Sequence, residues 1–143
     1  MQNNIDLSRF IKAQESSYQT ALSEIKNGRK LTHWMWYIFP QIQGLGMSST
    51  SIYYAISDLD EARAYLNDTY LGKNLSTICT ALLELTSNNP TEVFGRPDDM
   101  KLKSCMTLFL LASDENSLFQ KVLDKFFDGK QDKRTVKILE NMS

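Results

Sequence analysis

Residues 28–41 read GRKLTHWMWYIFPQ, and this stretch carries the strongest structural signal in the chain. Thr32 is placed to cap a short helix over residues 33–39, which Pro40 ends because proline has no N–H and its ring disfavours helix in the preceding residue. Six large apolar residues follow one another inside it, and at about 100° per residue they cover the whole circumference of a helix. We therefore expect this segment to form the centre of the core, with both tryptophans buried.

A longer helix is expected before this segment. Apolar residues recur at helical spacing from Leu7 to Ile25, after a polar stretch that ends at Asp6. Asn27–Gly28 then provides a glycine stop. The pattern predicts one amphipathic helix with a polar N-terminal cap.

Further helices are expected after the glycine-containing loop at residues 41–49. Apolar residues recur at helical spacing in each, and no window alternates as a strand does. Residues 90–94 lie between two breaks and can form one turn. The expected start signals are Ser57 with Asp60, then Asn67 or Asp68, Asp98, Ser113 and Asp132. The chain is therefore predicted to be all-α, a single compact multihelical domain of about six to eight helices over residues 1–143.

The composition of the chain restricts the classes of function that the protein can have. With 42% hydrophobic and 23% charged residues the chain is of the globular class, and its net charge of -1 disfavours nucleic acid as a partner. Two cysteines, Cys79 and Cys105, and one histidine are too few for a disulfide framework or a zinc site. The N-terminus has no apolar signal region and no apolar run has the length of a membrane span. We expect a cytoplasmic protein with no metal, cofactor or membrane contact.

Polar residues beside the tryptophan segment are candidates for ligand binding. His33 shares a helical face with Trp36 and Tyr37, whose rings could stack on a planar ligand, or it could be a hydrogen-bonded structural residue. Arg29 and Lys30 could attract an anion, or their charges could interact favourably with the C-terminal end of the dipole of the preceding helix. Both interpretations stay open for each group.

Other motifs in the chain are weaker. Gly44-Leu45-Gly46 follows a helix and a proline, not a strand, so it does not fit a dinucleotide fingerprint. Lys101 and Ser104 lie on one helical turn and could hold a phosphate or activate a nucleophile, although this spacing is common. Between residues 121 and 137 lysines and aspartates interleave, which predicts a solvated mixed face and not a basic patch.

Several short motifs together resemble a bacterial family, the domain of unknown function numbered 1810. Cys105 stands where a serine is usual in that family. The matching motifs cover almost the whole chain and are Asp6-Leu7 with Arg9-Phe10, Ala13-Gln14, Gly28-Arg29-Lys30, His33 to Gln41, Gly44-Leu45-Gly46 with Ser48, Tyr54-Ala55-Ile56, Glu61-Ala62 with Tyr65-Leu66, Leu71-Gly72, Phe94-Gly95, Asp98 with Lys101-Leu102, Ser104 with Met106 to Phe109, and Asp132 with Thr135.

The resemblance implies a compact all-helical domain and supplies no activity. Some relatives carry the label calpastatin, but that inhibitor works through disordered segments, which the regular helical pattern of this chain does not support. Two classes of function stay open: an enzyme or binder of a small anionic, nucleotide-like ligand, and a non-catalytic protein-interaction module without a named partner. No catalytic residue is assigned. The candidate ligand-binding residues are Arg29, His33, Trp36, Gln41, Ser48, Lys101 and Ser104.

Overall fold

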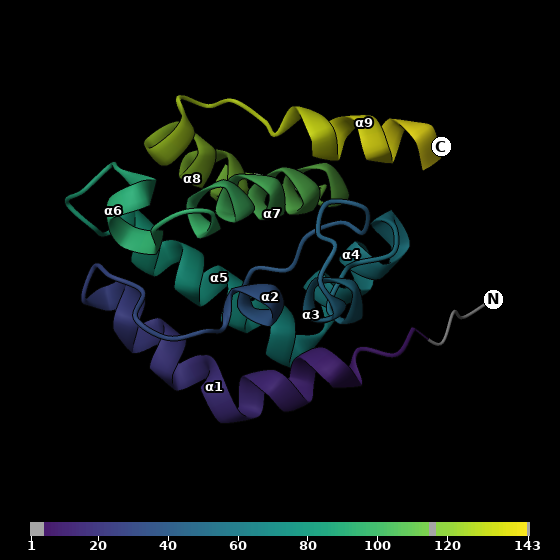
Figure 1. Ribbon diagram of the computed structural model, residues 1–143, viewed down its shortest axis with the longest axis horizontal. Coiled ribbons are helices and arrows are strands. Elements are labelled where there is room, and N and C mark those ends of the chain that lie inside the picture. Colours follow the sequence, from purple (N-terminus) through teal and green to yellow (C-terminus); the bar gives the residue numbers. More distant parts are fainter. Residues whose placement is uncertain (1–4, 115–116, 143) are drawn as a thin grey trace.

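The computed structural model describes residues 5–114 and 117–142, and within them the chain forms six long helices and three of four or five residues (Figure 1). No strand is formed in this part of the chain, so the all-α prediction is confirmed. The helices are α1 (Ser8–Lys26), α2 (Met35–Ile38), α3 (Ser49–Tyr53), α4 (Leu59–Asn67), α5 (Thr69–Leu83), α6 (Pro90–Phe94), α7 (Asp98–Ala112), α8 (Ser117–Phe127) and α9 (Lys133–Met142).

Helix α7 is the most buried element of the fold. Ten of its 15 residues are buried, because α4, α8 and α9 all pack against it. Helix α5 packs against α4 and α8, and α1 covers α5 from the far side, which gives the layers of Figure 1. The buried apolar side chains form one continuous cluster, in which Phe109 of α7 contacts the rings of Tyr65 and Phe119. The core is therefore centred on α7.

Helix α1 matches the prediction at its C-terminal end, whereas its N-cap is Leu7 and not the expected polar residue. Asp6 accepts a hydrogen bond from the Ser8 N–H at 2.9 Å, just before the helix begins. At its end, Gly28 has φ +83°, its N–H donates to the Ile25 carbonyl, and the Arg29 N–H donates to the Glu24 carbonyl. This pair of bonds is the Schellman motif, which favours glycine because the left-handed backbone conformation strains other residues.

The tryptophan segment differs from the prediction in length and burial. Its helix, α2, has only four residues, and Thr32 donates to the Glu24 carboxylate instead of capping it. Trp34 is buried at 1% exposure, as expected, whereas Trp36 and Tyr37 are half-buried and His33 is exposed. A four-residue helix packed on α1 cannot bury every side, so part of the aromatic surface remains accessible.

Three predicted helix starts are displaced. The cap of α4 is Asp58, which accepts from the Glu61 N–H, one residue after the predicted Ser57. Asp98 does not cap α7, because it lies inside the first turn and binds lysines instead. Ser113 is the C-cap of α7, and part of the predicted helix start falls on residues 115–116, outside the described residues. The predicted caps at Asp68 for α5 and Asp132 for α9 are confirmed.

Candidate functional site

A pocket of about 560 Å³ lies beside α2. The loop that follows α2 forms one wall, and it is held in place where the Gln43 N–H donates to the Ile56 carbonyl and the Ile56 N–H donates to the Gln41 carbonyl, each at 2.8 Å. Helix α9 forms the opposite wall. The lining residues are Trp36, Gln41, Ile42, Gln43, Gly44, Gly46, Met47, Ser51, Ile52, Tyr54, Ala55, Ile138 and Met142.

The pocket is mainly apolar and aromatic, with uncharged polar groups along its wall. Gln43 donates to the Ser57 carbonyl at 3.3 Å, which leaves its own amide oxygen free to accept. Neither the Trp36 indole N–H nor the Gln41 side chain bonds to any residue in the described ranges, and no buried polar atom there lacks a partner. Both groups are therefore accessible at the pocket. Such a wall suits a flat ligand with hydrogen-bonding edges.

Glu24 holds the approach to α2 in shape. Its Oε1 accepts from the Leu31 N–H at 2.7 Å, the Thr32 N–H at 3.0 Å and the Trp34 indole at 2.9 Å, and its Oε2 accepts from the Thr32 hydroxyl at 2.7 Å. Burial alone would raise the pKa of this carboxyl group, but these hydrogen bonds outweigh burial and lower the pKa to about 2. Glu24 is therefore ionised and orders the segment that presents Trp36.

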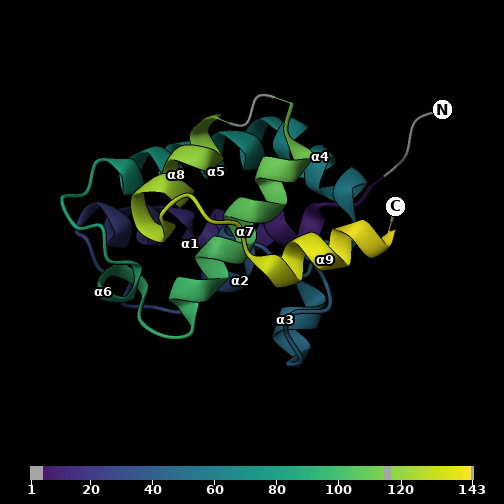
Figure 2. The ribbon, with the colours of Figure 1, turned by 90° about the horizontal axis from the view of Figure 1, so that it is seen from above.

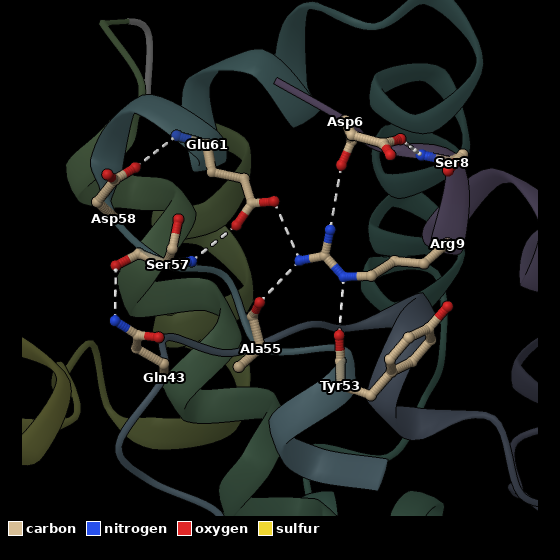
Figure 3. A network of polar contacts seen from close by, with 9 residues as sticks. All are labelled: Asp6, Ser8, Arg9, Gln43, Tyr53, Ala55, Ser57, Asp58 and Glu61. Atoms are coloured by element: carbon tan, nitrogen blue, oxygen red, sulfur yellow. Dashed lines mark hydrogen bonds and ion pairs between the residues drawn. The ribbon is translucent and has the colours of Figure 1, made fainter. Parts of the chain in front are cut away.

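Arg9 holds a third wall of the pocket, the chain that follows α3 (Figure 3). Its guanidinium donates to the carbonyls of Tyr53 and Ala55, each at 2.8 Å, and forms a 3.0 Å ion pair with Glu61. Glu61 in turn accepts from the Ser57 N–H at 2.7 Å. Through these contacts α1 fixes the chain between α3 and α4, which includes the pocket residue Ala55.

Three charged groups form a chain of ion pairs that ends at the Trp36 ring, with Lys101 beside that ring and Lys30 over the ring of Trp34. The Lys101 Nζ is 5.7 Å from the centroid of that ring and 3.5 Å from Asp98 Oδ1. Asp98 Oδ2 is 2.9 Å from the Lys30 Nζ. One carboxylate is thus shared by two ammonium groups, so Asp98 compensates the charge of Lys101 only in part.

The seven candidate residues do not all meet at this pocket. Trp36 and Gln41 line it, and Lys101 adjoins it through the Trp36 ring. Arg29 and His33 lie at the surface and are not among the lining residues.

Two hydroxyl groups among the candidates have structural partners. Ser48 is the N-cap of α3 and bonds to Ser51, which does line the pocket. Ser104 is buried and donates to the Met100 carbonyl and to Asp132 Oδ2.

Several pocket residues were not among the sequence candidates. Tyr54, Ile138 and Met142 line the pocket but belong to no catalytic or ligand-binding sequence motif. Helix α9 comes next to the pocket only when the chain folds, so the sequence alone does not place its residues there. Arg9 supports the wall, and its signal was available, since it belongs to one of the motifs that the sequence shares with the family. Arg9 could be found from the sequence because it is a polar residue inside a family-like motif on an amphipathic helix.

Two kinds of feature are absent from the described part of the chain. Residues 5–114 and 117–142 contain no cluster of three or more histidine, cysteine or acidic side chains that could hold a metal ion. No helix within them is both long and apolar enough to cross a membrane.

Comparison with known proteins identifies relatives and no activity. A search of curated proteins finds no match. The crystal structure of the conserved hypothetical protein Rv1873 from Mycobacterium tuberculosis is similar, with a TM-score of 0.94 and 43% identity over 96% of this chain and 99% of that one. Residues 4–139 match the family described as "Protein of unknown function (DUF1810)". The protein therefore belongs to the DUF1810 family.

Proposed function

We propose that the protein binds a small, planar, anionic compound of nucleotide-like chemistry in the pocket beside α2. One observation carries the proposal: an accessible tryptophan ring forms the pocket wall, and the Lys101 ammonium lies 5.7 Å from its centroid. A flat heterocycle would stack on Trp36, and its acidic group would meet the partly compensated charge of Lys101.

The uncharged groups of the pocket support a heterocyclic ligand. A nucleobase presents hydrogen-bond donors and acceptors along one edge, and side-chain amides pair with such edges. Gln41 and Gln43 place two amide groups on the wall that also contains Trp36. The pocket volume of about 560 Å³ is within the range of small-molecule sites. Trp36 and Gln41 would hold the planar part, and Lys101 the acidic part.

A thermal-shift screen tests this function. The panel contains adenosine, AMP, ADP and ADP-ribose, and a ligand at 100 times its Kd stabilises the fold by about 2.7 kcal/mol. Trp36→Ala should remove the shift caused by every ligand that binds, whereas Lys101→Ala should remove only the shifts caused by the anionic ligands and leave that of uncharged adenosine unchanged. Lys121→Ala, which removes an exposed lysine from α8, is the matched control. A shift that survives Trp36→Ala contradicts the proposal.

The second candidate function is a non-catalytic interaction module, and the surface of α3 favours it. Met47, Ile52 and Tyr53 are 87%, 64% and 59% exposed, and Figure 2 shows α3 projecting from the body of the molecule. Large apolar side chains gathered at the surface are typical of protein contacts. The screen separates the two functions: a hit that depends on Trp36 supports the pocket, and a panel without hits supports the module.

We also propose that the protein works in the cytoplasm. Cys79 and Cys105 are both free and buried, and unpaired thiols are usual in a reducing compartment. Fractionation of cells that express the natural protein tests this location.

A further inference from the structure

A second concavity, of about 550 Å³, lies on another part of the surface, where the connection between α8 and α9 crosses α7 (Figure 2). Four cations line it: Lys103 from α7, Lys130 from the connection, and Lys133 and Arg134 from the first turn of α9. None of these four is among the residues that line the Trp36 pocket. We call it the lysine–arginine cleft.

The single carboxylate of the cleft is directed to the protein interior. Asp132 Oδ2 accepts from the Ser104 hydroxyl and from the Thr135 N–H, each at 3.1 Å, and from the Thr135 hydroxyl. The Asp132 N–H donates to the Thr107 hydroxyl at 2.8 Å. Asp132 is therefore occupied as the cap of α9 and as its anchor on α7.

The cations of the cleft have no ion-pair partner in residues 5–114 and 117–142. Lys103 lies 6.0 Å from the centroid of the Phe127 ring, which restrains it on one side of the cleft. Like charges that share one concavity repel each other until an anion neutralises them. The whole chain has a net charge of -1, so this positive charge is local and not a general property of the surface.

We propose that the lysine–arginine cleft binds a compound with two or more adjacent phosphate groups. The residues that line the cleft carry four positive charges and one negative charge, and this excess of three exceeds the charge of one phosphate group. The planar guanidinium of Arg134 can bind two oxygens of one phosphate, and the lysines act as point charges on the next. The occupant is thus a pyrophosphate or triphosphate group.

Isothermal titration with inorganic pyrophosphate and tripolyphosphate tests the proposal, since neither probe has a planar group for the Trp36 pocket. The double variant Lys133→Ala/Arg134→Ala should weaken binding about tenfold or more, equivalent to about 1.4 kcal/mol. The matched control Lys73→Ala/Lys121→Ala removes the same charge from exposed positions on α5 and α8 and should change Kd less than about twofold. Melting temperatures of both variants verify that the fold is intact.

Two results would overturn the proposal. One is an equal loss of affinity in the two double variants, which would mean that only net charge matters. The other is sulfate, at matched ionic strength, binding as tightly as tripolyphosphate. Lys101→Ala should leave the affinity for tripolyphosphate unchanged, because Lys101 is the residue that would hold an anion at the Trp36 pocket, so the two sites are tested independently.

Discussion

Glu24 is a single residue on which the shape of a whole segment depends. Its carboxylate accepts four hydrogen bonds from Leu31, Thr32 and Trp34. A buried donor left without an acceptor costs more free energy than the original bond contributed. The position of Trp36, two residues beyond Trp34, is therefore sensitive to Glu24.

Substitution of Glu24 should be destabilising and should change the response to acid. The folded-state pKa of about 2 lies below the ordinary value of 4.5 for a glutamate, so this carboxylate stabilises the fold above pH 4.5 and loses that effect as the pH falls toward 2. Glu24→Gln should lower the free energy of unfolding by roughly 1–3 kcal/mol at neutral pH and flatten this part of the pH profile. Urea unfolding measured at several pH values, with exposed Glu15→Gln as control, checks both effects.

The two tryptophans should respond differently to a quencher. Trp34 is 1% exposed and Trp36 is half-buried. In the single-tryptophan variants Trp36→Phe and Trp34→Phe, iodide should leave Trp34 emission almost unchanged and should quench Trp36 emission. If Trp36 emission were protected from iodide as fully as Trp34 emission, the aromatic wall of the pocket would be closed in solution.

The thiols should be inert in the folded protein. Burial raises the pKa of both Cys79 and Cys105, which keeps them protonated near neutral pH. A thiol reagent should therefore label the native protein slowly and label the protein in denaturant completely. Rapid labelling of Cys105 under native conditions would contradict the buried placement.

At the scale of elements, the joint between α4 and α5 tolerates no side chain at one position. A Cβ atom at Gly72 would lie 2.2 Å from the Leu66 carbonyl oxygen, which is backbone and cannot turn aside. At Gly28 a Cβ atom would meet nothing within 4 Å, so only the backbone φ of +83° opposes substitution there. The two glycines are thus required for different reasons.

Substitution of each glycine by alanine tests the steric reason at Gly72 and the backbone reason at Gly28 separately. Gly28→Ala should cost about 1–2 kcal/mol, the strain of a left-handed residue. Gly72→Ala should cost more, because α4 and α5 must move apart and disturb the contact of α4 with α7. Thermal unfolding measured by circular dichroism gives the order, and a smaller cost at Gly72 would show that the joint yields easily.

At the scale of the whole molecule, Arg9 connects the first helix to the chain between α3 and α4. Its partners Tyr53, Ala55 and Glu61 lie 44 to 52 residues away in sequence, and its side chain is 19% exposed beside the 8% exposed Glu61. Charge-assisted hydrogen bonds of this kind contribute more than neutral ones. The integrity of one pocket wall therefore depends on a residue near the N-terminus, more than 40 residues away in sequence.

Removal of Arg9 should loosen that wall. Arg9→Ala should lower the free energy of unfolding by about 2–3 kcal/mol and speed amide exchange of residues 41–56. Lys12→Ala, at an exposed position of the same helix, should change stability by less than about 0.5 kcal/mol. Hydrogen-exchange mass spectrometry measures the local effect, and exchange that rises equally over the whole chain would assign Arg9 a global role only.

Local patterns in the sequence were enough for the fold class and for several helix boundaries. The apolar spacing before Gly28, the glycine itself and the caps at Asp68 and Asp132 act within a few residues, so they can be interpreted without tertiary contacts. The same patterns failed at Thr32 and Asp98. The Thr32 hydroxyl binds Glu24 and the Asp98 carboxylate binds Lys30, so neither side chain caps the helix as the local pattern predicts.

Both proposed sites were decided by the tertiary structure. The sequence placed Trp36, Gln41 and Lys101 among the candidates, but only packing brings α9 to the Trp36 pocket and leaves Arg29 and His33 outside it. Interleaved lysines and aspartates predicted a mixed surface near α9, yet Asp132 turns inward to Ser104 and the cations remain together. Helical periodicity is a short-range property that the sequence determines by itself, whereas the direction in which a charged side chain finds its partner depends on residues that only the fold brings near.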